Sequence, residues 1–160
     1  MHWRFVDKAL FFSPWEAILT LKAGSLEEYS LLERWGEPRR APALLLLETC
    51  VQSARWLIEA SSGFSLSGDP VEITRWNALP GLRPGERFCA GLRVVTRDAG
   101  HIRFSLRQKI LAPAEEAPSA QTWQGTTEND DDGSLICAFT PLEPRHLPAD
   151  RACLWQEMRA

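Results

Sequence analysis

The stretch from residue 42 to 60, PALLLLETCVQSARWLIEA, is the longest apolar part of the chain, and it has no glycine and no internal proline. Leu44 to Leu47 cover a helix on nearly every side, and apolar residues continue at helical spacing as far as Ile58. Pro42 suits the first turn of a helix, where a missing N–H costs nothing. The stretch therefore predicts a long buried helix that is enclosed by other structure.

One polar stripe interrupts this apolar helix. Its members stand four, three and four residues apart and so lie on one face: Glu48, Gln52, Arg55 and Glu59. A carboxylate on the inner half of such a helix must be paired, protonated or functional, because an isolated buried charge is too costly to keep. Glu48 is therefore either an active-site acid or base, or a buried carboxylate satisfied by Gln52 and local amides.

The composition is that of one soluble globular domain. The chain has 160 residues, 44% of them hydrophobic and 24% charged, which leaves room for a real core. A net charge of −3 argues against a general nucleic-acid binder. Neither a signal-peptide pattern nor an apolar run of membrane-spanning length is present, so we expect a cytoplasmic protein without a membrane segment.

The four cysteines are far apart in the sequence. Their spacing fits neither a zinc site nor a disulfide scaffold, so we expect reduced thiols, no metal and no cofactor. Cys50 is interpreted as a packed thiol, because no histidine lies near it in sequence to activate it.

Strand patterns surround the predicted helix. We expect strands over residues 3–12, 17–22, 71–76, 86–96, 101–111 and 134–140. The turn RDAG at 97–100 should join two of them as an antiparallel hairpin. One long helix followed by strands with tight turns is an α+β plan, in which an antiparallel sheet wraps a central helix.

The remaining segments read as connections within a single domain over 1–160. Residues 26–40 read as a turn of helix and a loop, and the Ser- and Gly-rich residues 61–70 read as a connection. Residues 112–133 are polar and acidic and predict a mobile loop. Residues 141–160 predict a peripheral tail.

The central helix resembles a motif of the hotdog-fold family of β-hydroxyacyl-(acyl-carrier-protein) dehydratases. Residues 41–52, APALLLLETCVQ, are similar to the family's M-P-G-V-L-x-[VI]-E-A-x-A-Q, with the proline, the apolar run, the Glu and the Gln at the same spacing. Weaker matches occur in the family's order at Phe5-Val6-Asp7-Lys8, Arg83-Pro84-Gly85-Glu86 and Asp132-Gly133. The resemblance covers most of the chain and implies the hotdog fold.

The chain departs from this family at the catalytic histidine. In the family that histidine lies eight residues ahead of the proline, and here the position is Arg34, in ERWGEPR at 33–39. Arginine stays protonated and cannot act as the base. Loss of the base should cost several orders of magnitude in rate, so we expect dehydratase activity to be impaired or altered.

The resemblance also implies roles for individual residues. It implies that Glu48 is catalytic and that Pro42, Ala43, Gln52, Arg34 and Trp35 bind substrate, with Ala43 in place of a glycine whose amide helps to hold the thioester carbonyl. Arg34 either faces an acidic carrier protein or lies in a solvated loop. Trp35 either lines an acyl tunnel or packs in the core.

Three functions follow from these patterns. The first is a dehydratase-like protein of fatty-acid or polyketide-type metabolism that binds acyl thioesters of acyl carrier protein or coenzyme A. The second is an acyl thioesterase that uses Glu48 and a positioned water. The third is a non-catalytic partner of an active hotdog dehydratase. We expect a homodimer with its two sheets joined edge to edge and sites at the interface, or a heterodimer in the third case.

Overall fold

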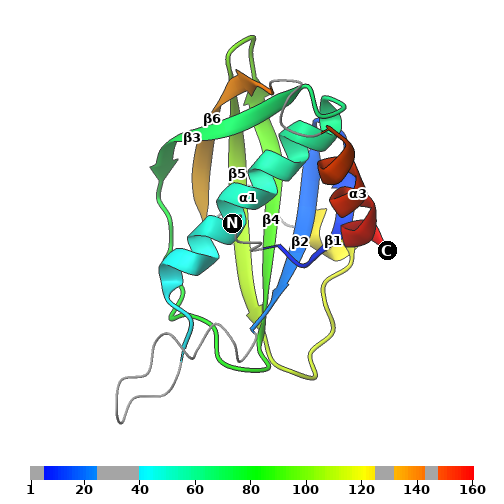
Figure 1. Cartoon of the computed structure of the whole chain (residues 1–160). Helices are drawn as coiled ribbons and strands as arrows, with labels where there is room; N and C mark the ends of the chain where they lie inside the picture. Colours follow the sequence, from blue (N-terminus) through cyan, green and yellow to red (C-terminus); the bar gives the residue numbers. More distant parts are fainter. Residues whose placement is uncertain (1–5, 25–39, 125–131, 143–147) are drawn as a thin grey trace.

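The chain forms an antiparallel sheet curved around one long helix (Figure 1). The computed structural model describes residues 6–24, 40–124, 132–142 and 148–160. The strands are β1 (Lys8–Ser13), β2 (Ala17–Ala23), β3 (Leu66–Thr74), β4 (Arg87–Arg97), β5 (His101–Leu111) and β6 (Gly133–Pro141). The helices are α1 (Ala43–Ser61), α2 (Ala120–Gln124) and α3 (Pro148–Arg159). The predicted α+β plan is confirmed.

The sheet has the order β1-β2-β4-β5-β6-β3, and each neighbouring pair is antiparallel. The predicted hairpin of 86–96 and 101–111 is the β4–β5 pair. Its turn is held by Asp98, whose carboxylate accepts hydrogen bonds from the backbone N–H groups of Gly100 and His101, both at 2.8 Å. These hydrogen bonds lower the pKa of Asp98. Strands β3 and β6 are neighbours in the sheet, although β4 and β5 lie between them in the sequence.

The main core lies between α1 and the inner face of the sheet. The side of α1 that packs on the sheet carries Leu46, Cys50, Ala54 and Leu57, all fully buried. Side chains in a strand alternate between the two faces, so Phe88 and Ala90 of β4 face this core while Cys89 faces the opposite side. The predicted helix is present, but it is less enclosed than predicted, because Leu44 is 70% exposed and Leu45 and Leu47 are only partly buried.

Strand β3 begins earlier than the sequence predicted. Residues 61–70 read as a connection, yet β3 already starts at Leu66 and contains Gly68 and Pro70. The strand lies at the edge of the sheet, where proline is tolerated, and its pairing with β6 shifts register between Pro70 and Glu72. Gly68 leaves room for Ile58, because a Cβ there would lie 2.3 Å from Ile58 Cδ1 and would force that side chain to move.

A second, smaller core covers the outer face of the sheet. Leu19, Cys89 and Leu111 are buried there under Trp123 of α2 and neighbouring apolar residues. Gly91 leaves the space for that tryptophan, because a Cβ at this position would lie 1.7 Å from Trp123 Nε1. Ala117 and Trp123 of the predicted acidic loop therefore pack against the sheet. Mobility of the loop stays a prediction, and residues 125–131 are outside the described residues.

The sequence predicted a peripheral C-terminal tail, and this prediction is wrong. The helix α3 of the tail packs into the main core. Trp155 and Met158 are buried there, at 5% and 0% exposure. The ring of Trp155 stacks on Trp56 of α1 at 5.7 Å and meets Phe12 of β1 edge-on at 4.9 Å. Aromatic burial of this size gives α3 a firm attachment to both elements.

Candidate functional site

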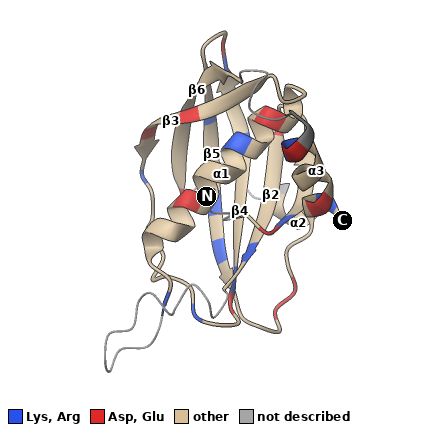
Figure 2. Ribbon diagram, in the orientation of Figure 1, with Lys and Arg blue, Asp and Glu red and all other residues tan. Residues whose placement is uncertain are grey.

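The polar stripe of α1 divides into two pairs with different surroundings. Charged residues of α1 lie along the side of the helix that faces away from the sheet (Figure 2). In the first pair, Gln52 Nε2 donates a hydrogen bond to Glu48 Oε1 at 3.2 Å. Among the described residues, Gln52 is the only hydrogen-bond partner of the half-buried Glu48. The spacing of four residues predicted this contact.

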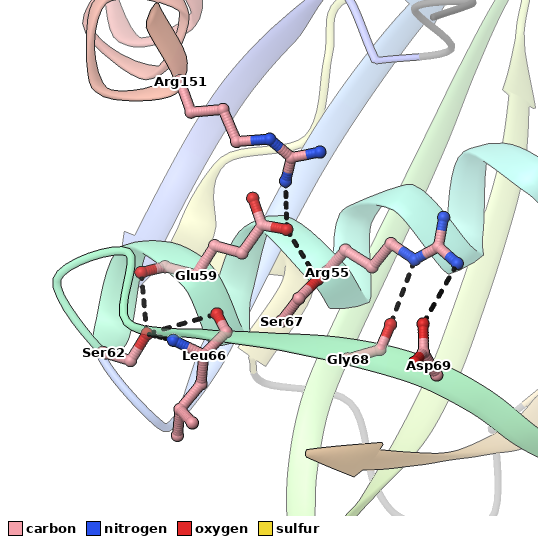
Figure 3. Close-up of polar contacts among 8 residues, drawn as sticks. All are labelled: Arg55, Glu59, Ser62, Leu66, Ser67, Gly68, Asp69 and Arg151. Carbon is pink, nitrogen blue, oxygen red and sulfur yellow. Dashed lines mark hydrogen bonds and ion pairs between the residues drawn. The ribbon is translucent and has the colours of Figure 1, made fainter. Parts of the chain in front are cut away.

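The second pair fastens α1 to other elements (Figure 3). Arg55 Nε donates to the carbonyl oxygen of Gly68 at 3.0 Å, and its Nη2 lies 3.7 Å from Asp69 Oδ1. Glu59 is only 1% exposed; it accepts a hydrogen bond from Ser67 Oγ at 2.7 Å and forms an ion pair with Arg151 of α3. The structural interpretation of a buried carboxylate therefore fits Glu59, which leaves Glu48 as the candidate for chemistry.

The start of α1 offers backbone donors close to Glu48. Pro42 precedes the helix, no side chain caps it, and its first turn has no acidic residue. The N–H groups of a first helical turn have no intrahelical acceptor and carry the positive end of the helix dipole. Leu45 N donates to the Pro42 carbonyl at 2.9 Å, whereas the amides of Ala43 and Leu44 have no acceptor within the described parts of the chain. An oxyanion is the kind of group that such donors bind.

The segment between β3 and β4 contacts the residue that precedes this helix start. Ala41 N donates to the Leu82 carbonyl at 2.7 Å, and Leu82 N donates to the Ala41 carbonyl at 3.2 Å. Both residues are buried. Sequence reasoning did not find this contact, because the residues that follow β3 carry only turn signals.

Apolar side chains are exposed beside the candidate site. Leu44 in the first turn of α1 is 70% exposed, and Val71 and Ile73 of the edge strand β3 are 57% and 38% exposed. Strand β3 runs along α1, with its end towards the start of the helix (Figure 1). The site thus borders an apolar sheet edge.

The structure brings together four of the six predicted site residues. Pro42 and Ala43 begin α1, and Glu48 and Gln52 follow on the same helix. Arg34 and Trp35 are outside the described residues.

The buried cysteines are not suited to nucleophilic chemistry. Burial raises the pKa of Cys89 to about 11 and that of Cys137 to about 12. Burial also raises the pKa of Cys50, and the nearby Asp132 carboxylate adds to this shift. A thiol with a raised pKa is almost fully protonated at neutral pH. The prediction of a packed thiol at Cys50 therefore agrees with its surroundings.

Neither a metal-binding cluster nor a membrane-spanning helix occurs among the described residues. No group of three His, Cys, Asp or Glu side chains is placed to hold a metal ion. In the same residues, no helix has both the length and the apolar character needed to cross a membrane.

The chain was compared with known proteins. No protein-family profile matches the sequence, and no curated protein matches it. Solved structures do match, at low sequence identity. The dehydratase heterocomplex ApeI:P from Xenorhabdus doucetiae contains a chain that is 8% identical, with a TM-score of 0.56 over 89% of this chain and 85% of that one.

Two streptococcal structures are also similar. A Streptococcus mutans protein bound to acetyl-CoA is 9% identical, with a TM-score of 0.51 over 85% of this chain and 87% of that one. A hypothetical thioesterase from Streptococcus pneumoniae with coenzyme A is 10% identical, with a TM-score of 0.50 over 82% and 84%. Identities this low show the fold alone. The chain has the hotdog fold, shared with proteins named as thioesterases and dehydratases.

Proposed function

We propose that this protein acts on acyl thioesters, with Glu48 as the reacting carboxylate. The observation that carries the proposal is the Glu48–Gln52 pair, placed just after a helix start whose amides of Ala43 and Leu44 have no acceptor among the described residues. Solved proteins of the same fold hold acetyl-CoA and coenzyme A, which supports a thioester as the ligand. Acyl carrier protein is a second possible carrier, because it presents its acyl group as a thioester too.

Hydrolysis is the reaction that this arrangement supports best. Glu48 would take a proton from a water molecule while the water oxygen adds to the thioester carbonyl carbon. The N–H groups of Ala43 and Leu44 would hold the resulting oxyanion, as donors at a helix start can. Collapse of this intermediate breaks the C–S bond, and the proton passes from Glu48 to the leaving sulfur. The products are a carboxylic acid and a free thiol.

Dehydration of 3-hydroxyacyl thioesters is the second candidate. The spacing of Pro42, Glu48 and Gln52 favours it, because it is similar to that of the dehydratase helix. Dehydration needs a base beside the carbonyl and an acid at the departing hydroxyl, and one carboxylate cannot fill both roles at once. We infer that this reaction, if retained, is impaired in the isolated chain. A partner subunit with its own base would restore it in a heterodimer.

We also propose that two copies join through β3. The edge strand carries exposed Val71 and Ile73, and soluble proteins rarely leave apolar side chains on an unpaired edge. The register shift after Pro70 would confine backbone pairing to the end of the strand, beside the start of α1. Exposed Leu44 would then face the partner subunit, and each site would lie at the interface.

The test follows two products from two substrates. The purified protein is incubated with a simple acyl thioester and with a 3-hydroxyacyl thioester, while free thiol and enoyl product are measured in parallel. We expect free thiol from both substrates, and none above background for Glu48→Gln. Enoyl product that depends on Glu48 would favour the dehydratase, whereas neither product would favour a non-catalytic subunit.

A further inference from the structure

A buried glutamine lies in a row of core residues on the inner face of β5. Gln108 follows Ile102, Phe104 and Leu106 on this face, and although it is polar, it is only 8% exposed. A polar amide in such a place costs stability unless it is hydrogen-bonded. Its Oε1 accepts a hydrogen bond from Trp76 Nε1 at 3.2 Å, and its Nε2 donates to the backbone carbonyl of Asn77.

The same glutamine is tied to the beginning of β6. Its backbone N donates to Asp132 Oδ2 at 2.7 Å, while Asn77 N donates to the Asp132 carbonyl at 2.9 Å. Both backbone groups of Asn77 are therefore held, one by Gln108 and one by Asp132. This arrangement fixes the point at which the chain leaves the end of β3 and turns back towards α1.

The segment that follows Asn77 leads to the helix start. It reaches Leu82, which makes the two hydrogen bonds with Ala41 described above. Gly81 allows this close approach: its φ is +92°, and a Cβ would lie 2.2 Å from the Ala41 carbonyl oxygen. A chain of contacts thus runs from Gln108 through Asn77 and residues 78–82 to Ala41, directly before the first turn of α1.

This support matters because the first turn of α1 is anchored in the core mainly by its last residue, Leu46. It lacks a side-chain cap and an acidic residue, and Leu44 points into solvent. Helix ends without caps open easily. The Ala41–Leu82 contact therefore holds the chain on the near side of the Ala43 and Leu44 amides, while Leu46 holds it on the far side.

We propose that Gln108 is a positioning residue that keeps the first turn of α1 wound for carbonyl binding. The inference rests on the proposed function, since it assigns to those amides the thioester oxygen. Gln108 does not touch the reacting atoms; it acts through Asn77 and the Ala41–Leu82 contact. Loss of its amide leaves Asn77 held only by its hydrogen bond to the Asp132 carbonyl, which loosens the helix start while Glu48, one turn further on, keeps its place.

The test combines hydrogen exchange with kinetics. Gln108→Met removes both side-chain hydrogen bonds at similar volume, and Gly81→Ala disrupts the far end of the same chain of contacts. Ser105→Ala is the matched control, because Ser105 is a buried polar residue of β5 on the opposite face. We expect both test variants to exchange amide hydrogens at residues 41–47 faster and to lose about tenfold or more in kcat for thiol release, less than the loss of a whole donor.

Two results would overturn the inference. One is a folded Gln108→Met or Gly81→Ala protein with wild-type exchange at residues 41–47. The other is faster exchange with an unchanged kcat in a protein whose Glu48→Gln variant is inactive. If Glu48→Gln is as active as the wild type, the proposed function fails by itself, and the exchange arm still decides whether Gln108 holds the helix start.

Discussion

Gln52 donates its side-chain amide to the carboxylate of Glu48 one turn earlier on the same helix, at 3.2 Å. A donor to the charged form orients a carboxylate without neutralising it. Arg55 and Glu59, three and seven residues beyond Gln52, instead fasten α1 to β3 and α3. The polar stripe of α1 thus has two parts: Glu48 and Gln52 form the candidate site, and Arg55 and Glu59 attach the helix to β3 and α3.

Glu48→Gln should remove thiol release and leave the fold intact. Loss of a general base costs about 10²–10⁴ in rate. Since Glu48 is half-buried and its one described hydrogen bond is to Gln52, we expect the melting temperature to change little. The exposed carboxylate of Glu157 on α3 provides the control, so Glu157→Gln should be fully active. A Glu48→Gln protein with wild-type rates would refute the catalytic role.

Arg151→Ala should destabilise the protein through Glu59. The carboxylate of Glu59 is 1% exposed and would lose its ion-pair partner, whereas Arg151 is 37% exposed. Breaking a fully buried pair costs about 3–5 kcal/mol, and the partial exposure of Arg151 reduces our expectation to about 2 kcal/mol. Urea unfolding measures the change. Adding Glu59→Gln to Arg151→Ala should recover part of the loss, and a fully additive double variant would contradict the pairing.

Gly91→Ala should displace α2 from the outer face of the sheet. The added methyl group would occupy the place of the Trp123 ring, which must move. Overpacking of this kind costs about 1–3 kcal/mol. The tryptophan emission should shift to longer wavelength, and the further change Trp123→Ala should restore stability towards that of Trp123→Ala alone. An unshifted spectrum would show that the outer face accommodates the methyl group.

Val71→Lys and Ile73→Lys should each convert a dimer into monomers. Two charges brought together at a two-fold interface repel each other and lose their hydration. Sedimentation at several protein concentrations measures the association. Val95→Lys is the control, because Val95 of β4 is also exposed, at 52%, but lies away from the sheet edge. A wild-type chain that sediments as a monomer would exclude the proposed β3 interface.

Only Cys153 should react quickly with a thiol reagent in the native protein at pH 8. It is exposed, while the other three cysteines are buried. With the pKa of Cys89 raised to about 11 and that of Cys137 to about 12, about one thiol in a thousand or fewer is ionised at that pH. All four thiols should react in denaturant. Rapid reaction of more than one native thiol would show that the core opens.

The sequence predicted those parts of the fold whose signal is local. The helix α1 was found because a long apolar run without glycine has few alternatives, and the β4–β5 hairpin because Ile102, Phe104 and Leu106 alternate with polar residues. The start of β3 was missed, since Gly68 and Pro70 are turn residues by composition. Their place in a strand depends on the packing of Ile58 and on the edge position.

The site was predicted only where its residues share one helix. Glu48 and Gln52 meet because they stand four residues apart, whereas the contacts of Gln108 with Trp76 and Asn77 join distant segments. One signal was present: Gln108 falls on the apolar side of the alternation in β5. A polar residue at a core position predicts a buried hydrogen-bond network, although it does not say with which partner.

The stacking of Trp155 on Trp56 also sets an order for folding. The two rings meet only after the chain has passed through four strands, and the closure of so long a loop is slow compared with the formation of the β4–β5 hairpin. We therefore expect α3 to dock late in folding. Before α3 docks, water solvates the Glu59 carboxylate. After α3 has docked, its release must break the Glu59–Arg151 ion pair and the Trp56–Trp155 stack together.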